Sequence, residues 1–488
     1  MAPTYEDLAE EVRQQRQENE LLKQQIDWLK RQLFGGGKSE KIDRDQALLA
    51  LGEMEARQKQ MQEQEVSYTR AKPTAQRRCP AERFEKVPVT ETVEIVPEEV
   101  KADPDLYEQI GAEETFEIDI TPPKIFKRLI RRLKFRHRIE RSLPPVVAAA
   151  PERPVQGSYA SAGLVSWVVL SKYLDHLPLY RQQKMFERWG ANISRQSMAD
   201  WVQVVAFWLK PLYNHMRAEL FQGGYVQADE TPVRFQDPDS KKGKTSQGYL
   251  WVVHGPGLGV LFDWRLTRRH AEATRLLEGF EGLLQTDGYE AYNALAKDNE
   301  AIVHLGCWAH ARRGFYNARL DHPREAGIIL GLIGKLYDFE EQYRDKGLSA
   351  AERAECREKD QARILKWLRI VIAISRNRCV PQSNLGRACS YALPRWESLC
   401  GYLERGNVEI DNNLIENKIR PSAIGKKNWL FVGSPEAGER TAVIYSLLLT
   451  CEIHGVDPHA WLKDVLAKAP VTPGEAGQKA LLPYNWRR

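Results

Sequence analysis

The stretch "GGYVQADETPVRF" (223–235) opens the part of the chain whose pattern decides the fold. Its apolar and β-forming residues predict a first strand. Two further β-rich runs follow, "GYLWVVHG" (248–255) and "GVLFDWRL" (259–266), with a turn expected at Pro256-Gly257.

Helices and strands alternate after this point. A helix is expected at about 269–280, and the apolar run in "GLLQTDGYEAY" (282–292) then predicts a fourth strand that stops at Asp287. "EAIVHLGCW" (300–308) predicts a fifth strand. The order β-β-β-α-β-α-β is that of a ribonuclease-H-like domain, a mixed sheet with helices against both faces. Residues 315–405 read almost wholly helical and are interpreted as an insertion.

Three acidic residues are placed by this pattern at one site. Asp229 is expected to end the first strand and Asp287 the fourth, and these strands are neighbours in the predicted order. After the insertion, "IDNNLIENKIRPSAIGKKNWLF" (410–431) brings Glu416. Converging carboxylates need cations, and Mg²⁺ (or Mn²⁺) takes oxygen ligands. Two ions about 3.5–4 Å apart activate an attacking oxygen and stabilise a leaving one in phosphodiester chemistry.

Other interpretations of these acids remain open. A short helix is expected over 412–419, ending before Pro421, and on it Glu416 and Arg420 would form an ordinary surface pair. Asp229 and Asp287 have common structural roles as cap or turn residues. Glu230 is a rival for the first position, and two further acids are rivals for the third: Glu409 and Asp411.

The bulk composition describes a cytosolic protein of several domains. The 488 residues are 42% hydrophobic and 28% charged, with a net charge of +5. No run is long enough to span a membrane, and the start of the chain lacks the pattern of a signal peptide. The seven cysteines include no CxxC pair, so a reduced protein without a disulfide framework is expected.

The amino-terminal third carries a heptad and a charge reversal. Residues 5–33 place apolar residues at both core positions of a heptad, which favours self-association as a coiled coil over a helix packed on its own domain. An acidic, strand-like stretch (81–120) precedes a strongly basic one (124–141). This reversal predicts a small β module whose basic segment either follows DNA phosphates or is simply solvated.

Two further segments point to DNA. "YRQQKMFERWGANISRQSMADWV" (180–202) reads as helix, turn and a second helix capped at Ser194, the pattern of a helix-turn-helix with Arg195 and Gln196 at the start of the recognition helix. The second segment is "CWAHARRGFYNA" (307–318). Its Cys307 and His310 are expected to support the site by orienting the local backbone and the His310 ring near the acids, and it also contains two candidate phosphate contacts. The candidate phosphate contacts of the chain are Arg312, Arg313, Arg420, Lys426 and Lys427. No zinc site is predicted, because Cys307 and His310 lack a second ligand pair.

The expected organisation is therefore multidomain α+β. The boundaries are 1–34 coiled-coil zipper, 35–72 spacer, 73–141 β module with the basic segment, 142–158 proline-rich linker, 159–215 helix-turn-helix-like DNA-binding helices, 220–314 first part of the ribonuclease-H-like core, 315–405 helical insertion, 406–455 second part of the core with the third acid, and 456–488 C-terminal tail.

The chain resembles transposases of the insertion-sequence-66 family. The resemblance rests on "ADETP", "LQTDGYEAYN", "HLGCWAHARRGF", "DNNLIENKIRPSAIGKKNWLFVGS" and the closing "HGVDPHAWLKDVL…LLPYNW", and it covers nearly the whole chain. It implies a DDE transposase whose triad falls on Asp229, Asp287 and Glu416, with Asn412 and Asn413 as the paired asparagines before the third acid. Such an enzyme uses divalent metal to free a 3′-hydroxyl at the element's ends, and that hydroxyl then attacks target DNA.

The resemblance also implies partners and exposes two departures. The partners are the terminal inverted repeats, target DNA and accessory proteins of the same element, in the bacterial cytosol at the nucleoid. Family members often carry a four-cysteine zinc module, of which only Cys79 remains. The usual Glu-Arg is Glu416-Asn417 here, which removes one phosphate contact. Two alternatives to an active transposase are a catalytically lapsed DNA-binding or assembly protein and a nuclease without strand transfer.

Overall fold

The computed structural model describes residues 124–135, 138, 146–147, 153–240, 245–472 and 474–487. All of them belong to one of two compact units, Asp119–Arg488; the other unit is Met1–Ile118. The predicted zipper, the spacer and most of the 73–141 module lie outside the described residues. In the described part of the chain, no helix has the length and apolar character needed to cross a bilayer.

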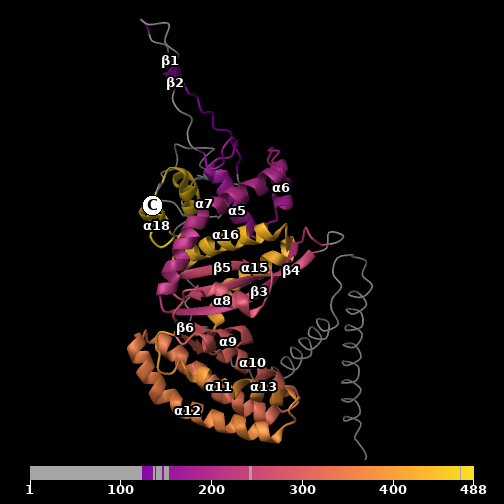
Figure 1. The fold of residues 1–488 in the computed structure, drawn as a ribbon, viewed down its shortest axis with the longest axis vertical. Coiled ribbons are helices and arrows are strands. Elements are labelled where there is room, and N and C mark those ends of the chain that lie inside the picture. The colour runs from indigo at the N-terminus through magenta and orange to yellow at the C-terminus, as the bar shows by residue number, and fades with distance from the viewer. Residues whose placement is uncertain are drawn as a thin grey trace, which may run out of the picture. The chain divides into compact units, whose positions relative to one another are not determined.

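One mixed sheet forms the centre of this unit (Figure 1). Its six strands, counted over the described residues, are β3 (Tyr225–Gln236), β4 (Thr245–Gly255), β5 (Gly259–Arg265), β6 (Gly282–Gln285), β7 (Ile302–Leu305) and β8 (Phe431–Val432). They are ordered β5-β4-β3-β6-β7, and β8 pairs with the far end of β3. The pairs β3–β4 and β4–β5 are antiparallel, whereas β3–β6 and β6–β7 are parallel. The expected mixed sheet and element order are confirmed.

Helices cover both faces of the sheet. Successive side chains of a strand point to opposite faces. The Phe262 ring packs against Tyr445 of α16 (Pro435–Ile453) on one face, and Trp251 packs against Tyr292 of α9 (Glu290–Asp298) on the other. The first face carries α7 (Arg195–Gln222), α15 (Asn413–Trp429) and α16 (Pro435–Ile453), and the second carries α8 (His270–Leu276) and α9 (Glu290–Asp298). Helix α16 lies between the sheet and α7, so it is buried on nearly every side (Figure 1).

The helix-turn-helix-like segment shares the core of the sheet. Helices α5 (Ala162–Tyr173) and α6 (Leu179–Arg188) precede α7, which begins after the predicted cap, where the Ser194 side chain accepts the Ser197 N–H. Helix α7 continues through Pro211 to the start of β3, and its apolar face joins the main hydrophobic core.

The expected C-terminal tail is folded. Helix α17 (Pro458–Lys468) packs against α5 with Trp461 and Leu462 fully buried, and α18 (Glu475–Ala480) follows. This segment therefore completes the core, because its apolar residues recur at helical spacing and are covered by α5.

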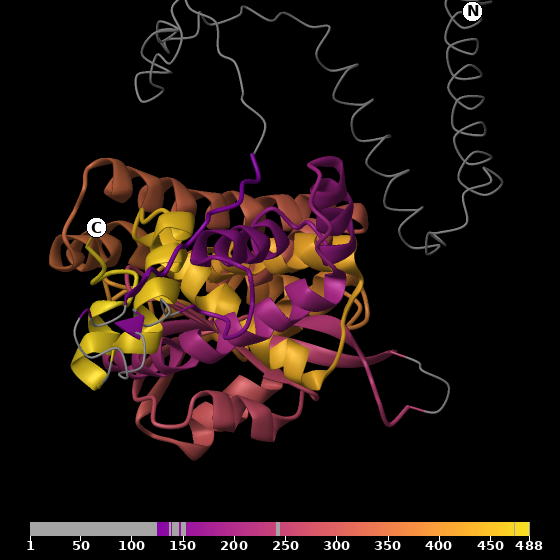
Figure 2. The same cartoon turned by 90° about the horizontal axis from the view of Figure 1, so that it is seen from above.

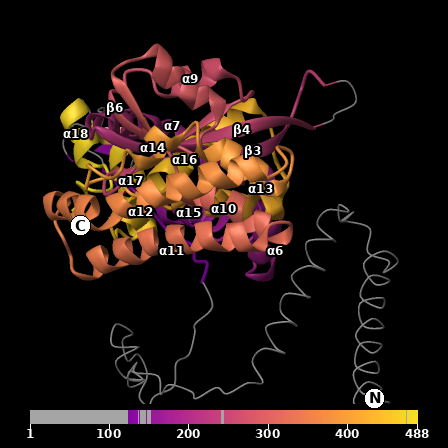
Figure 3. The same ribbon diagram turned by 90° about the horizontal axis from the view of Figure 1, so that it is seen from below.

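A second hydrophobic core lies in a helical body, defined here as α10–α14. Its helices are α10 (Trp308–Asn317), α11 (Pro323–Asp345), α12 (Ala350–Arg378), α13 (Asn384–Ala392) and α14 (Trp396–Cys400), and they face the viewer in Figure 3. The predicted insertion, 315–405, is helical as expected. Its core also includes earlier residues, among them Leu305 of β7 and Trp308 of α10, whose ring packs edge-on against Trp396.

Two local expectations were wrong. Strand β3 does not end at Asp229 but runs to Gln236, because β4 pairs with it from Gln227 to Gln236 in a long hairpin (Figure 2). Helix α15 does not end before Pro421 but continues to Trp429. A mid-helix proline costs about 3 kcal/mol, and packing of α15 on β3 and β4 offsets this cost. Within the predicted 142–158 linker, β2 (Val146–Val147) pairs with β1 (Lys134–Phe135).

Candidate active site

The two aspartates lie at equivalent places on neighbouring strands. In the parallel ladder between β3 and β6, Gln227 is paired with Gln285. Asp229 and Asp287 each follow two residues later, at the point where the β6 chain leaves the sheet. Equal spacing from a paired position puts the two carboxylates side by side on the same face, because side chains alternate with a period of two.

Asp229 is surrounded by negative charge. Burial raises its pKa to about 7, and Glu230, Asp287 and Glu416 add to the rise. Its Oδ1 accepts the Glu230 N–H at 2.7 Å, and Asp287 Oδ1 accepts the Tyr289 N–H at 2.8 Å. Within the described residues, no Lys, Arg or His forms an ion pair with either aspartate. Like charges at close range favour the protonated form, so the site is electrostatically unsatisfied as it stands.

Glu416 reaches this cluster from the first turn of α15. The side chain is one-third exposed, and its oxygens lie 3.8 Å from His310 Nε2 and 3.8 Å from Arg313 Nη2, both on α10. These distances are long for ion pairs, so neither contact fixes the carboxylate firmly. Helix α15 lies along β3 on the face that carries Asp229, which explains the influence of Glu416 on the pKa of Asp229.

The three rival acids have other partners. Glu230 points to the opposite face of β3, where it pairs with Arg268 and accepts the Tyr292 hydroxyl at 2.9 Å. The remaining two belong to the segment before α15. Glu409 accepts two bonds from Arg353, each of 3.0 Å, and Asp411 accepts the Tyr337 hydroxyl at 2.7 Å and the Asn413 N–H at 3.0 Å.

The supporting residues form a chain of contacts behind Glu416. Cys307 Sγ lies 3.3 Å from His310 Nδ1 and accepts the Asn412 N–H at 3.4 Å, and burial raises the pKa of this thiol to about 12. The ring of His310 therefore lies between Cys307 and Glu416. The Asn412 side chain is fully buried with neither polar atom bonded within the described residues, whereas Asn413 Nδ2 donates to Asp411 at 2.8 Å.

The candidate DNA contacts differ in their surroundings. Arg312, Arg313, Arg420 and Lys427 are exposed, as are Arg195 and Gln196 at the start of α7. Lys426 instead donates to Thr231 Oγ1 and to the Pro232 carbonyl, both at 3.0 Å, and so fastens α15 to β3. Arg181 of α6 donates to Asn428 at 3.5 Å, which joins the helix-turn-helix-like segment to the basic end of α15.

Sequence reasoning missed the residues that hold the aspartate loop. The Tyr391 hydroxyl donates to the Asp287 carbonyl at 2.6 Å, and Arg395 donates to the Gly288 carbonyl at 3.3 Å. Gly288 has φ +86°, a conformation that favours glycine, and an added Cβ would lie 2.9 Å from Arg395 Nε. These contacts come from α13 and the segment after it, about 100 residues away, so no local pattern signalled them.

The carboxylate oxygens of Asp229, Asp287 and Glu416 are the kind of ligand that a hard cation prefers, but the three side chains are not arranged around a single point. Within the described residues, no group of three or more His, Cys, Asp or Glu side chains is close enough to hold an ion. Burial, followed by the nearby carboxylates of Glu230, Asp287 and Glu416, nevertheless raises the pKa of Asp229 to about 7. Oxygen ligands with excess negative charge are what Mg²⁺ and Mn²⁺ require.

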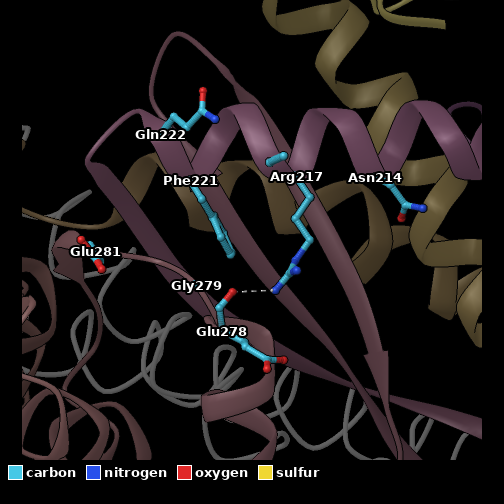
Figure 4. A pocket seen from close by; sticks show the side chains of 8 residues that line it. Asn214, Arg217, Phe221, Gln222, Glu278, Gly279 and Glu281 are labelled. Carbon is cyan, nitrogen blue, oxygen red and sulfur yellow. Dashed lines mark hydrogen bonds between the residues drawn. The ribbon is translucent and has the colours of Figure 1, made fainter. Parts of the chain in front are cut away.

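A surface pocket of about 640 Å³ lies away from these acids, at the opposite ends of β3 and β6 (Figure 4). Arg217 crosses it and donates to the Leu276 carbonyl at 2.8 Å, and Glu278 and Glu281 line the rim. The Arg217 guanidinium therefore already has a hydrogen-bond partner at the end of α8. This pocket does not contribute to the acidic site.

Comparisons with known proteins identify the class and then the family. Residues 157–440 match the family model described as "Transposase IS66 family", residues 446–484 match "IS66 C-terminal element", and residues 21–85 match "Transposase C of IS166 homeodomain". These matches place the chain in the class of transposases. It belongs to the IS66 family.

Two relatives come from Sinorhizobium fredii (strain NBRC 101917 / NGR234). "Uncharacterized protein y4jD" is 34% identical over 395 residues, which is 78% of this chain and 76% of the relative. "Uncharacterized protein y4qI" is 34% identical over 412 residues, 81% of this chain and 75% of the relative. Their names assign no activity, so the chemistry must be argued from the site of this chain.

Proposed function

We propose that this protein is a DDE transposase with a ribonuclease-H-like core, in which Asp229, Asp287 and Glu416 hold the divalent ions for DNA cleavage and strand transfer. The observation that carries the proposal is the Gln227–Gln285 pairing, from which both aspartates are two residues removed. The strand order also supports it, with the antiparallel hairpin partners β4 and β5 on one side of β3 and the two parallel strands β6 and β7 on the other.

Two Mg²⁺ (or Mn²⁺) ions, when bound, activate the attacking oxygen and stabilise the leaving one. The aspartates provide rigid ligands because strand β3 and the end of β6 fix their backbones. Burial and the neighbouring acids raise the pKa of Asp229 to about 7, and as a metal ligand it would bind through its ionised carboxylate. Among the described residues, the Glu416 carboxylate has ion-pair contacts only with His310 and Arg313, each at 3.8 Å, so its side chain is free to turn toward the aspartates.

The DNA is held by basic residues on two sides of the acids. Glu416, Arg420 and Lys427 are four and eleven residues apart on α15 and so share one face, which would carry a phosphate backbone past the third acid. Arg312 and Arg313 extend this surface on α10. Arg195 and Gln196 would read the terminal inverted repeat from the start of α7. The match of residues 21–85 to a homeodomain model also supports DNA binding.

The test is metal-dependent cleavage and joining of labelled DNA that carries an end of the element, with end binding measured in parallel. Asp229→Asn, Asp287→Asn and Glu416→Gln should each abolish cleavage and leave binding intact. The matched controls are the rival acids, Glu409→Gln and Asp411→Asn, which should retain metal-dependent cleavage. Full activity of Glu416→Gln would refute the assignment of the third acid, and nicking without joined products would refute strand transfer.

A further inference from the structure

Two buried glutamines precede the two aspartates at identical spacing. The chain reads Gln227-Ala228-Asp229 on β3 and Gln285-Thr286-Asp287 at the end of β6, where Gln285 is the last strand residue. Both glutamine side chains are fully buried. A buried amide costs free energy unless its donors and acceptor are bonded, so such residues are retained in a core only where partners exist.

The partners of these glutamines lie on the segment that leads into α15. Gln227 Nε2 donates to the Asp411 carbonyl at 2.9 Å and to Gln285 Oε1 at 3.0 Å. Gln285 Nε2 donates to the Glu409 carbonyl at 2.8 Å. The Tyr225 hydroxyl completes the network, donating to Gln285 Oε1 at 2.7 Å and accepting the Glu409 N–H at 3.2 Å.

Gln227 also caps the helix that carries the third acid. The first N–H groups of a helix have no partner within it and are usually bonded by the side chain of the N-cap residue. The N-cap of α15 is Asn412, whose side chain makes no capping bond. Gln227 Oε1 instead accepts the Ile415 N–H at 3.1 Å, so a residue of β3 supplies the cap. The start of α15 is thereby fixed to the strand that carries Asp229.

We propose that Gln227 and Gln285 are positioning residues that set Glu416 against the two aspartates. This inference rests on the proposed function for its catalytic consequence. Directional hydrogen bonds hold one register between the strands and the 409–415 segment, whereas apolar side chains would allow the segment to slide. Because Gln227 and Gln285 are bonded to each other, the network ties both aspartate-bearing strands to the start of the Glu416 helix.

The first test compares Gln227→Met and Gln285→Met with wild type in the full chain by amide hydrogen exchange. Met is similar in length and removes the amide. The matched control is Gln182→Met, because Gln182 is equally buried but donates only to the carbonyls of Val168 and Leu177. Exchange over residues 411–418 should rise at least about tenfold in the first two variants and stay unchanged in Gln182→Met. Unchanged exchange in Gln227→Met would overturn the proposal.

The second readout separates turnover from binding. Both Met variants should lower the cleavage rate on bound DNA about 10- to 100-fold, since small misplacements of a catalytic group have effects of this size, and end affinity should stay within about twofold. An equal loss of rate in Gln182→Met would overturn the proposal, because the effect would then be general destabilisation. If the Met variants do not fold, Gln227→Asn, one methylene shorter, provides the same comparison. A wild type that never cuts would refute the proposed function, and the exchange result would still decide the positioning of Glu416.

Discussion

The carboxylate of Glu340 on α11 binds two arginines of α12 inside the helical body α10–α14. Only 1% of its side chain is exposed. Its oxygens accept bonds from Arg357 Nε at 2.8 Å and Nη2 at 2.7 Å, and from Arg353 Nη2 at 2.6 Å. Arg357, with no exposed side-chain surface, also donates to the carbonyls of Tyr402 and Val408. Glu340 thus fixes the position of Arg357, which in turn bonds the backbone segment that precedes Glu416.

Replacing Glu340 with Met should destabilise this body by about 3–5 kcal/mol, the cost of leaving a buried charge without its partner. Arg353 keeps Glu409, so Arg357 accounts for most of the loss. In the double variant Glu340→Met/Arg357→Met no charge is stranded. The two effects should therefore be non-additive by about 2–3 kcal/mol.

The assay is urea unfolding followed by circular dichroism, with hydrogen exchange to locate the loss on α12. Glu341→Gln is the control, because Glu341 is the exposed neighbour and should change stability by less than about 0.5 kcal/mol. Additive effects in the double variant, or a loss below about 1 kcal/mol in Glu340→Met, would refute the reasoning.

The same pair predicts acid sensitivity. Burial by itself would raise the pKa of Glu340, but the bonds and charges of Arg357 and Arg353 outweigh it and leave the pKa below its usual 4.5. A carboxylate with a lowered pKa stabilises the folded state at neutral pH, and this contribution is lost as pH falls through the folded pKa. Wild type should therefore lose more stability between pH 6 and pH 3 than Glu340→Met does.

Three further predictions concern the site and its support. Burial and acidic neighbours raise the pKa of Asp229 from 3.8 to about 7, so ionisation of this side chain opposes folding increasingly as the pH rises between these values. In EDTA, Asp229→Asn should therefore stabilise the protein by up to about 4 kcal/mol at pH 8 and not at pH 4. Equal melting temperatures of the variant and wild type at pH 8 would contradict this. Tyr391→Phe removes the donor to the Asp287 carbonyl and should slow cleavage about tenfold at unchanged DNA affinity, whereas wild-type rates would show that the bond is dispensable. Gly406→Ala would push a Cβ into a backbone carbonyl of α12 and should cost about 1–3 kcal/mol in thermal unfolding. Gly334→Ala, which meets nothing within 4 Å, is its control and should be neutral or stabilising.

The sequence by itself determined the order of elements and the identity of the candidate acids. The β-rich runs from Tyr225 to Arg265 and the later alternation of helix and strand are local patterns, so their periodicity was sufficient to predict the mixed sheet. The sequence was also sufficient to predict that Asp229 and Asp287 lie beside each other, because the order of the strands in the sheet determines which strand ends are adjacent. The α7 boundary was readable because Ser194 caps locally.

Only the tertiary structure decided what depends on distant partners. Pro421 predicts the end of a helix, yet α15 passes through it because packing on β3 and β4 outweighs the lost hydrogen bond. Glu409 and Asp411 differ from Glu416 in having hydrogen-bond partners on the helical body, Arg353 and Tyr337, and the sequence did not reveal these contacts. Gln227 caps a helix that begins 186 residues later in the chain. Such bonds follow from how the folded chain brings remote backbone groups together, which no local propensity encodes.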